Sequence, residues 1–87
     1  MTIDPAEQAI FDTLAARGAQ KSICPTEAAR ALAGNPADDS WRKSLAPVRL
    51  AAQRLARAGR IEILRKGKSV SPEVLHGVIR LRLTQEG

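Results

Sequence analysis

Residues 39–59 contain the pattern that most restricts the fold of this chain, because their side chains separate into two faces at helical spacing. One face is apolar and suits burial against a core; its members are Trp41, Leu45, Val48, Ala52, Leu55 and Ala56. The opposite face carries no carboxylate; it comprises Arg42, Ala46, Arg49, Gln53 and Arg57, with Arg60 in the same phase just beyond the helix. We therefore expect a long amphipathic helix, buried on one side and open to an anionic partner on the other.

Pro47 leaves two ways of building this helix. A proline inside a helix removes one backbone hydrogen bond and clashes with the preceding turn, at a cost of about 3 kcal/mol. Either one helix starts at Ser40 and is kinked near Lys43, or a first turn over 40–44 precedes a helix capped by Ser44 with Pro47 in its first turn. The apolar phase continues across Pro47, which favours the kinked single helix.

Two shorter helices are predicted before this one. The first spans residues 5–17, and the residues on either side of it are good helix caps. The second begins at Pro25, after a brief extended segment at 22–23. Cys24 and Glu27 have the spacing of a capping box in which sulfur replaces the usual hydroxyl.

After residue 59 the apolar period changes from helical to alternating, which predicts two β-strands. They fall at residues 61–65 and 77–84 and should pair antiparallel, with residues 66–76 as a long basic loop between them. The order of elements is helix, short strand, helix, loop, helix, strand, loop, strand. This order predicts an α+β, mainly α, winged helix-turn-helix: three helices with a short strand and a C-terminal β-hairpin wing, in a single domain over residues 1–87.

The charge of the chain is divided unevenly along its length. The net charge is +5 over 87 residues, but the residues up to 39 have three basic and six acidic side chains. Those from 40 onward have eleven basic and three acidic side chains. A molecule with one strongly basic half is typical of nucleic-acid binding.

In helix-turn-helix proteins the second helix of the pair lies in the major groove of DNA. The candidate nucleic-acid-binding residues are therefore those of the long helix and of the basic loop: Arg42, Lys43, Arg49, Gln53, Arg54, Arg57, Arg65, Lys66 and Lys68. The competing interpretation is that arginine simply forms helix well and solvates a surface. Leu50 falls outside the core stripe and indicates a second alternative, a surface for a protein partner.

Other chemistry finds little support in the sequence. Cys24 is the only cysteine, which fits a reducing cytoplasm; it could be a reactive thiol at a helix start, or a small apolar cap. Cys24 and His76, the only histidine, are too few for a metal site. No signal peptide, membrane span, nucleophile–base pair or phosphate-binding loop is recognisable. We expect a cytoplasmic protein that is not an enzyme, with no cofactor, no metal and no small-molecule substrate.

Short motifs occur in order over nearly the whole chain. They are Ile23-Cys24-Pro25-Thr26-Glu27 with Ala29-Arg30, Trp41-Arg42, Val48-Arg49, Gly59-Arg60-Ile61, Lys66-Gly67-Lys68 with Val70 and Pro72, and Gly77 followed by Ile79-Arg80-Leu81-Arg82. In this arrangement the chain resembles small bacterial winged-helix proteins catalogued as a domain of unknown function. It departs from them at Ser71, where Asp is usual, and at Val78, where Pro is usual. The resemblance implies the winged-helix architecture, and a DNA-binding function by analogy.

The leading hypothesis is binding of double-stranded DNA through the third helix and the basic wing, in the context of transcriptional regulation. The alternative is a protein–protein interaction module, a homodimer that uses Leu50 and the alanine-rich helix and binds no nucleic acid. A thiol sensor at Cys24 is a third option.

Overall fold

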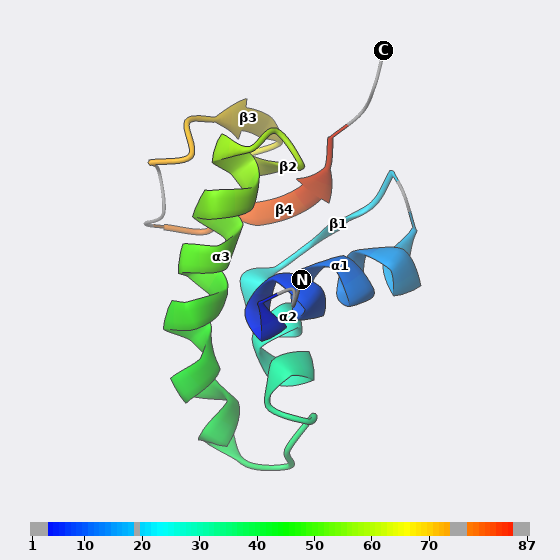
Figure 1. Cartoon of the computed structure of the whole chain (residues 1–87), viewed down its shortest axis with the longest axis vertical. Helices are drawn as coiled ribbons and strands as arrows, with labels where there is room; N and C mark the ends of the chain where they lie inside the picture. Colours follow the sequence, from blue (N-terminus) through cyan, green and yellow to red (C-terminus); the bar gives the residue numbers. More distant parts are fainter. Residues whose placement is uncertain (1–3, 19, 74–76, 85–87) are drawn as a thin grey trace.

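The computed structural model describes residues 4–18, 20–73 and 77–84. Three α-helices and one 3-10 helix occupy the first two thirds of the chain, and a small sheet follows (Figure 1). The elements in order are α1 (Pro5–Arg17), β1 (Ser22–Ile23), α2 (Pro25–Leu32), the 3-10 helix η1 (Asp39–Ser44), α3 (Leu45–Arg57), β2 (Ile61–Arg65), β3 (Lys68–Val70) and β4 (Arg80–Leu83).

The first two helices begin as their sequences predict. The Asp4 carboxylate caps α1 by accepting the N–H groups of Ala6 at 2.9 Å and Glu7 at 3.2 Å. At α2, the Cys24 N–H donates to Glu27 Oε2 at 2.7 Å, which is the glutamate half of a capping box. Both predicted helix starts are therefore confirmed, and they fix the direction in which each helix leaves its loop.

The prediction of one kinked helix across Pro47 is wrong. Residues 39–44 form η1, and α3 starts at Leu45 with Ser44 at its N-cap, so the second of the two alternatives holds. Pro47 is then the third residue of α3, in the turn whose N–H groups have no partner within an α-helix. The proline costs α3 no hydrogen bond there, whereas mid-helix it would have removed one.

The four strands form one antiparallel sheet in the order β1-β4-β2-β3. The predicted antiparallel pairing of the two C-terminal strands is confirmed, with Ile63 opposite Leu81. Ile23 lies opposite Leu81 on the other side, so Ile23, Leu81 and Ile63 form a fully buried row across the sheet. This row packs in the core with Ile10 and Leu14 of α1 and with Val48 of α3.

The expectation that residues 66–76 form only a loop is also wrong. Lys68–Val70 form β3, which pairs with β2 and places Arg65 opposite Lys68. The connecting turn has two residues, Lys66 and Gly67, with φ values of 53° and 80°. Two consecutive positive φ angles are what a tight hairpin turn between twisted strands requires. The hairpin that corresponds to a wing is therefore β2–β3, and β4 returns along the other edge of β2.

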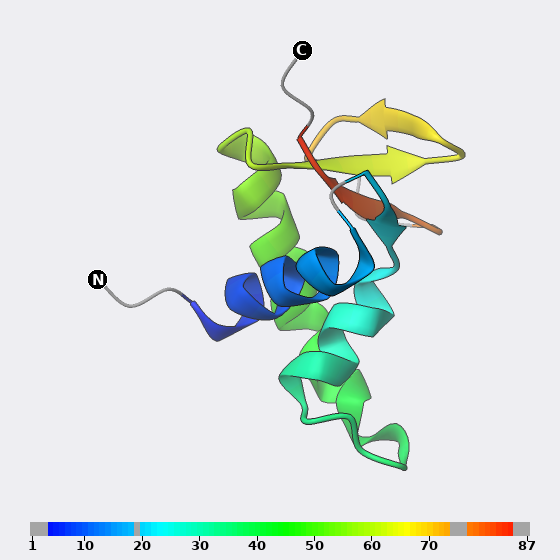
Figure 2. The ribbon, with the colours of Figure 1, turned by 90° about the vertical axis from the view of Figure 1, so that its right-hand side faces the viewer.

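Figure 1 shows α3 along one side of the molecule, α1 and α2 packed beside it, and the sheet at one end. Turned by 90°, the β2–β3 hairpin projects to the same side as the region of η1 (Figure 2). The arrangement is α+β, mainly helical and like that of a winged helix, as the order of elements predicts.

Candidate nucleic-acid interface

The nine candidate residues do not form one continuous face, because the fold places them in five different surroundings. Arg54 contacts α1, Gln53 and Arg57 contact the chain after β3, Arg42 and Lys43 lie in η1, and Arg49 lies between α2 and the segment before β4. The remaining three, Arg65, Lys66 and Lys68, belong to the hairpin. The surroundings of each group decide which cations are available to a ligand.

Arg54 is held by two carboxylates at the start of α1. Its Nε donates to Glu7 Oε2 at 2.9 Å, and its Nη2 lies 3.4 Å from Asp4 Oδ2. Half of the Arg54 side chain is exposed, against 21% of Glu7. The guanidinium therefore joins α3 to α1, and its charge is largely compensated by this contact.

Gln53 and Arg57 share one carboxylate, that of Glu73. Arg57 donates from Nε to Oε1 at 3.0 Å and from Nη2 to both carboxylate oxygens at 2.7 Å. Gln53 Nε2 donates to Oε2 at 3.1 Å. The basic face of the helix carries no acid in its own sequence, but the fold brings one to it from the segment that follows β3. The expected unbroken basic face is therefore interrupted here.

Arg42 lies at the end of the molecule that η1 forms. Its guanidinium carbon is 5.4 Å from the centre of the buried Trp41 ring, and that of Arg30 is 4.7 Å from the same ring. Both distances are within the range of cation–π attraction. Asp39 lies 3.9 Å from Arg42, both side chains being largely exposed. Trp41 thus anchors η1 in the core while Arg42 stays open to solvent.

The start of η1 is fixed by Asp38. Its Oδ1 accepts the Ser40 N–H at 3.0 Å. Hydrogen bonds with the side chain and backbone of Ser40 lower the pKa of Asp38 from its ordinary value of 3.8. Asp38 is therefore the N-cap of η1.

The hairpin cations lie around the turn at its tip. Lys66 and Lys68 are exposed, and within the part of the chain that the structure describes neither they nor Lys43 make an ion pair. Arg65 lies against Gly77: a Cβ at position 77 would meet Arg65 Nη2 at 3.4 Å. Gly77 has a φ of 77°, which also favours glycine. The segment entering β4 therefore lies against the tip of the hairpin.

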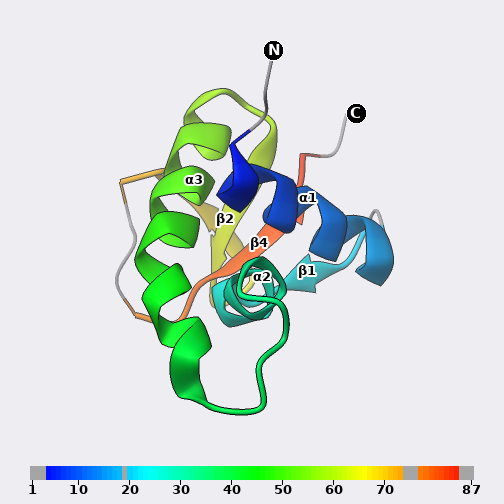
Figure 3. The same ribbon diagram turned by 60° about the horizontal axis from the view of Figure 1, so that its bottom comes forward.

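Two adjoining hollows meet at Val78, which is 84% exposed. One of about 150 Å³ joins α3 to the start of α2; its lining residues include Arg49, Cys24, Pro25, Thr26 and Gly77. The other, of about 300 Å³, joins the hairpin to β1; its lining residues include Lys66, Gly67, Arg80 and Ser22. Figure 3 shows the segment before β4 running between α3 and the region of α2, as the first hollow requires. This surface brings Arg49 and Lys66, two of the nine candidates, to either side of Val78.

The sequence-based candidates omitted three residues of this surface. Thr26 and Val78 carry no charge, so a search for cations in the sequence does not find them. Arg80 has the right charge, but its position depends on the sheet; its Nε donates to Ser22 Oγ at 2.7 Å and its Nη2 to the Ser22 carbonyl at 2.9 Å. Pairing of β1 with β4 therefore places this arginine beside the hairpin.

Within residues 4–18, 20–73 and 77–84, no group of three or more His, Cys, Asp or Glu side chains could hold a metal ion. His76 lies outside the described residues. Among those residues, no helix has the length and apolar character needed to cross a bilayer.

These features define a small α+β protein with a winged-helix-like arrangement and cations on both its long helix and its hairpin. The model of one protein family matches residues 4–84, nearly the whole chain. The chain therefore belongs to that family, which is described as "Protein of unknown function (DUF3253)". Its predicted membership of a domain of unknown function is confirmed. No curated protein matches the sequence.

Proposed function

We propose that this protein binds double-stranded DNA, in the cytoplasm and in the context of transcriptional regulation. The binding surface would run from η1 past Arg49 and Val78 to the β2–β3 hairpin. The observation that carries the proposal is the pair of hollows around Val78, which joins cations of α3, the hairpin and β4 beside the start of α2.

The geometry supports this function in two ways. In helix-turn-helix proteins the N-terminal part of the second helix contacts base edges, while the first helix approaches the phosphate backbone. Here Arg49, in the first half of α3, lies next to the start of α2, and Thr26 lines the same hollow. Lys66 and Lys68 extend the same positive side at the hairpin, where their charges are uncompensated within the described chain.

The expected salt dependence follows from the number of available cations. Arg54 and Arg57 are engaged with carboxylates, so we expect about four to six phosphate contacts from the other basic residues of the surface. A plot of the logarithm of the binding constant against the logarithm of the salt concentration should then have a slope of about −4 to −5. Fluorescence anisotropy of a labelled random duplex, titrated with the protein at rising salt, measures this slope. No binding at about 50 mM salt would exclude the function.

A matched pair of variants localises the surface. Lys66→Gln should reduce the magnitude of the slope by about 0.9, because one phosphate contact is lost. Arg60→Gln removes the same charge from the turn between α3 and β2, where Arg60 stacks over Phe11 at 5.3 Å. This turn lies on the side of the molecule opposite the hairpin tip (Figure 2), so its loss should leave the slope unchanged. Equal effects of the two variants would mean that net charge alone drives binding.

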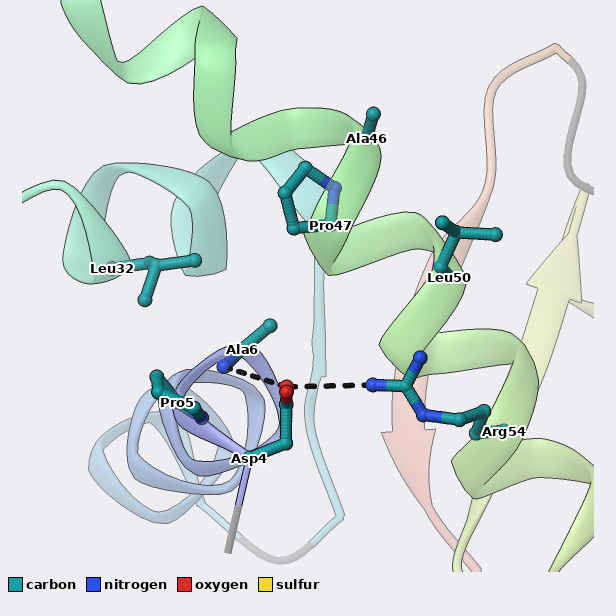
Figure 4. Close-up of a pocket in the computed structure, with 8 residues that line it drawn as sticks. All are labelled: Asp4, Pro5, Ala6, Leu32, Ala46, Pro47, Leu50 and Arg54. Carbon is teal, nitrogen blue, oxygen red and sulfur yellow. Dashed lines mark hydrogen bonds and ion pairs between the residues drawn. The ribbon is translucent and has the colours of Figure 1, made fainter.

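A second candidate function, homodimerisation, is favoured by a different observation. Leu50 is 53% exposed and stands beside a hollow of about 450 Å³ between α1, α2 and α3 (Figure 4). The other lining residues are Asp4, Pro5, Ala6, Leu32, Ala46, Pro47 and Arg54. A two-fold contact requires a projection and a recess on the same patch, and this patch has both.

Sedimentation over a range of protein concentrations distinguishes the two functions. A dimer that Leu50→Glu abolishes, with no affinity of either form for duplex DNA, would favour the second candidate. A monomer at all concentrations would exclude it.

A further inference from the structure

We propose that Gln53 and Arg57 form a phosphate-binding site on α3, and that the chain's own Glu73 occupies it until a phosphate of the nucleic-acid backbone takes its place. This inference rests on the proposed DNA-binding function. It adds a site at which a carboxylate of the chain competes with the phosphate of the ligand. Arg49, Gln53 and Arg57 follow one another at intervals of four residues, so they lie on one stripe of α3. The site therefore continues the surface that begins at Arg49.

The contacts of Glu73 are those that an oxyanion ligand would make. Two nitrogens of the Arg57 guanidinium and the amide nitrogen of Gln53 converge on its two oxygens, at 2.7 to 3.1 Å. Planar guanidinium groups bind carboxylates and phosphates through the same paired donors. A phosphodiester has the same charge as the Glu73 carboxylate, so it can replace the carboxylate with no net change of charge at the site.

The exchange is easy because the internal ion pair is exposed. The side chains of Arg57 and Glu73 are 54% and 61% accessible to solvent. Exposed ion pairs contribute little to stability, so releasing Glu73 costs little. The carboxylate is presented by a short turn in which the Glu73 N–H donates to Ser71 Oγ at 3.3 Å.

Glu73 has no acidic neighbour in the sequence that could take its place. It is the only acidic residue between positions 63 and 85, in the basic half of the chain. Residues 71–73, which follow β3, lie on the side of α3 that faces away from α1 and α2 (Figure 1). The consequence is that duplex DNA must displace Glu73 to reach this part of α3, which weakens binding and makes it selective for ligands dense in phosphate.

The decisive comparison uses two variants with the same change of charge. Glu73→Gln removes the competing carboxylate. Glu62→Gln is the control, because Glu62 also holds an arginine in a paired contact, accepting from Arg82 Nε at 3.1 Å and Nη2 at 2.8 Å, but on the sheet. We expect Glu73→Gln to bind duplex DNA roughly threefold to fivefold more tightly than Glu62→Gln, with a salt slope steeper by about 0.9. The thermal midpoints of both variants establish that each is folded.

Two results of this comparison would overturn the inference. Equal affinities of the two variants would mean that only net charge changed. Weaker binding by Glu73→Gln would mean that Glu73 orients Arg57 and does not compete for it. In both cases wild-type binding of DNA, and hence the proposed function, would stand.

A measurement without DNA tests the phosphate-binding site independently of the proposed DNA-binding function. Inorganic phosphate is titrated into ¹⁵N-labelled wild-type protein and Glu73→Gln, and the Nε–H resonance of Arg57 is followed by NMR, assigned through its loss in Arg57→Lys. We expect a saturable shift in Glu73→Gln that is weaker in wild type. Absence of a shift in Glu73→Gln would exclude the site even where duplex binding is found.

Discussion

Arg54 of α3 donates from its Nε to Glu7 Oε2 of α1 at 2.9 Å, across 47 positions of the sequence. Its Nη2 also lies 3.4 Å from Asp4, the residue that caps α1. One guanidinium thus connects the last turn of α3 to the first turn of α1. This relationship changes the role expected of Arg54 from a contact with the DNA backbone to a contact within the fold.

Replacing Arg54 should therefore affect stability more than binding. We expect Arg54→Ala to lower the free energy of unfolding by about 1 kcal/mol, because two partly exposed ion pairs are lost and solvent screens both. Its affinity for duplex DNA should change by less than about twofold, because the Arg54 guanidinium is already paired with two carboxylates of the first helical segment. Urea unfolding followed by the fluorescence of Trp41, the only tryptophan, measures the first quantity.

Glu7→Gln is the matched control for this variant. It breaks one of the two ion pairs without removing a cation, so it should lower stability by a smaller amount and leave DNA binding intact. A stable Arg54→Ala protein that has lost tenfold or more in DNA affinity would contradict the assignment.

Pro47 provides a second test, since its effect depends on its position in the helix. As the third residue of α3 it lacks an N–H group that an α-helix leaves without a partner in any case. Pro47→Ala should therefore change the free energy of unfolding by less than about 1 kcal/mol, its better helix propensity being offset by greater freedom of the unfolded chain. Stabilisation by about 3 kcal/mol would instead indicate a proline inside a continuous helix.

Local signals in the sequence predicted most of the fold. The caps of α1 and α2 depend on residues three or fewer positions apart, and alternation over residues 61–65 and 80–83 marks β2 and β4. The break at Ser44 was misjudged because the apolar phase continues through η1 into α3. The phase reports which side is buried, and it does not distinguish a 3-10 helix from an α-helix over six residues.

Strand β3 was missed for a related reason. It has three residues and no apolar alternation, and it exists because the Lys66–Gly67 turn reverses the chain onto β2. The sequence indicated the turn, but a strand of three residues is recognised only by its hydrogen bonds to the neighbouring strand, here β2. Its one inward residue, Val70, packs at the margin of the core opposite Ile63.

The helical phase of the candidate residues could be predicted from the sequence, whereas their carboxylate partners could not. Helical phase correctly placed Arg49, Gln53 and Arg57 on one stripe, because phase is a local property. Whether a cation on that stripe is available depends on carboxylates distant in sequence, such as Glu73, 16 positions from Arg57. No spacing within the helix encodes that contact, so the interruption of the basic face could not be read from the sequence.

The cap of η1 should give the molecule a pH response confined to acid. Asp38 accepts hydrogen bonds from Ser40 more strongly when it is ionised, which is why its pKa in the folded protein lies below 3.8. A carboxyl group whose pKa is lower in the folded state stabilises that state above the unfolded-state pKa, and this contribution is lost as the pH falls through the folded-state pKa. The order of η1 should therefore be constant from neutral pH down to about 4 and decrease below it.

The amide resonance of Ser40, followed by NMR during an acid titration, reports this transition directly. Asp38→Asn keeps an acceptor oxygen at the cap but cannot titrate, so the Ser40 transition should disappear in that variant; a transition that persists unchanged would assign the response to another group.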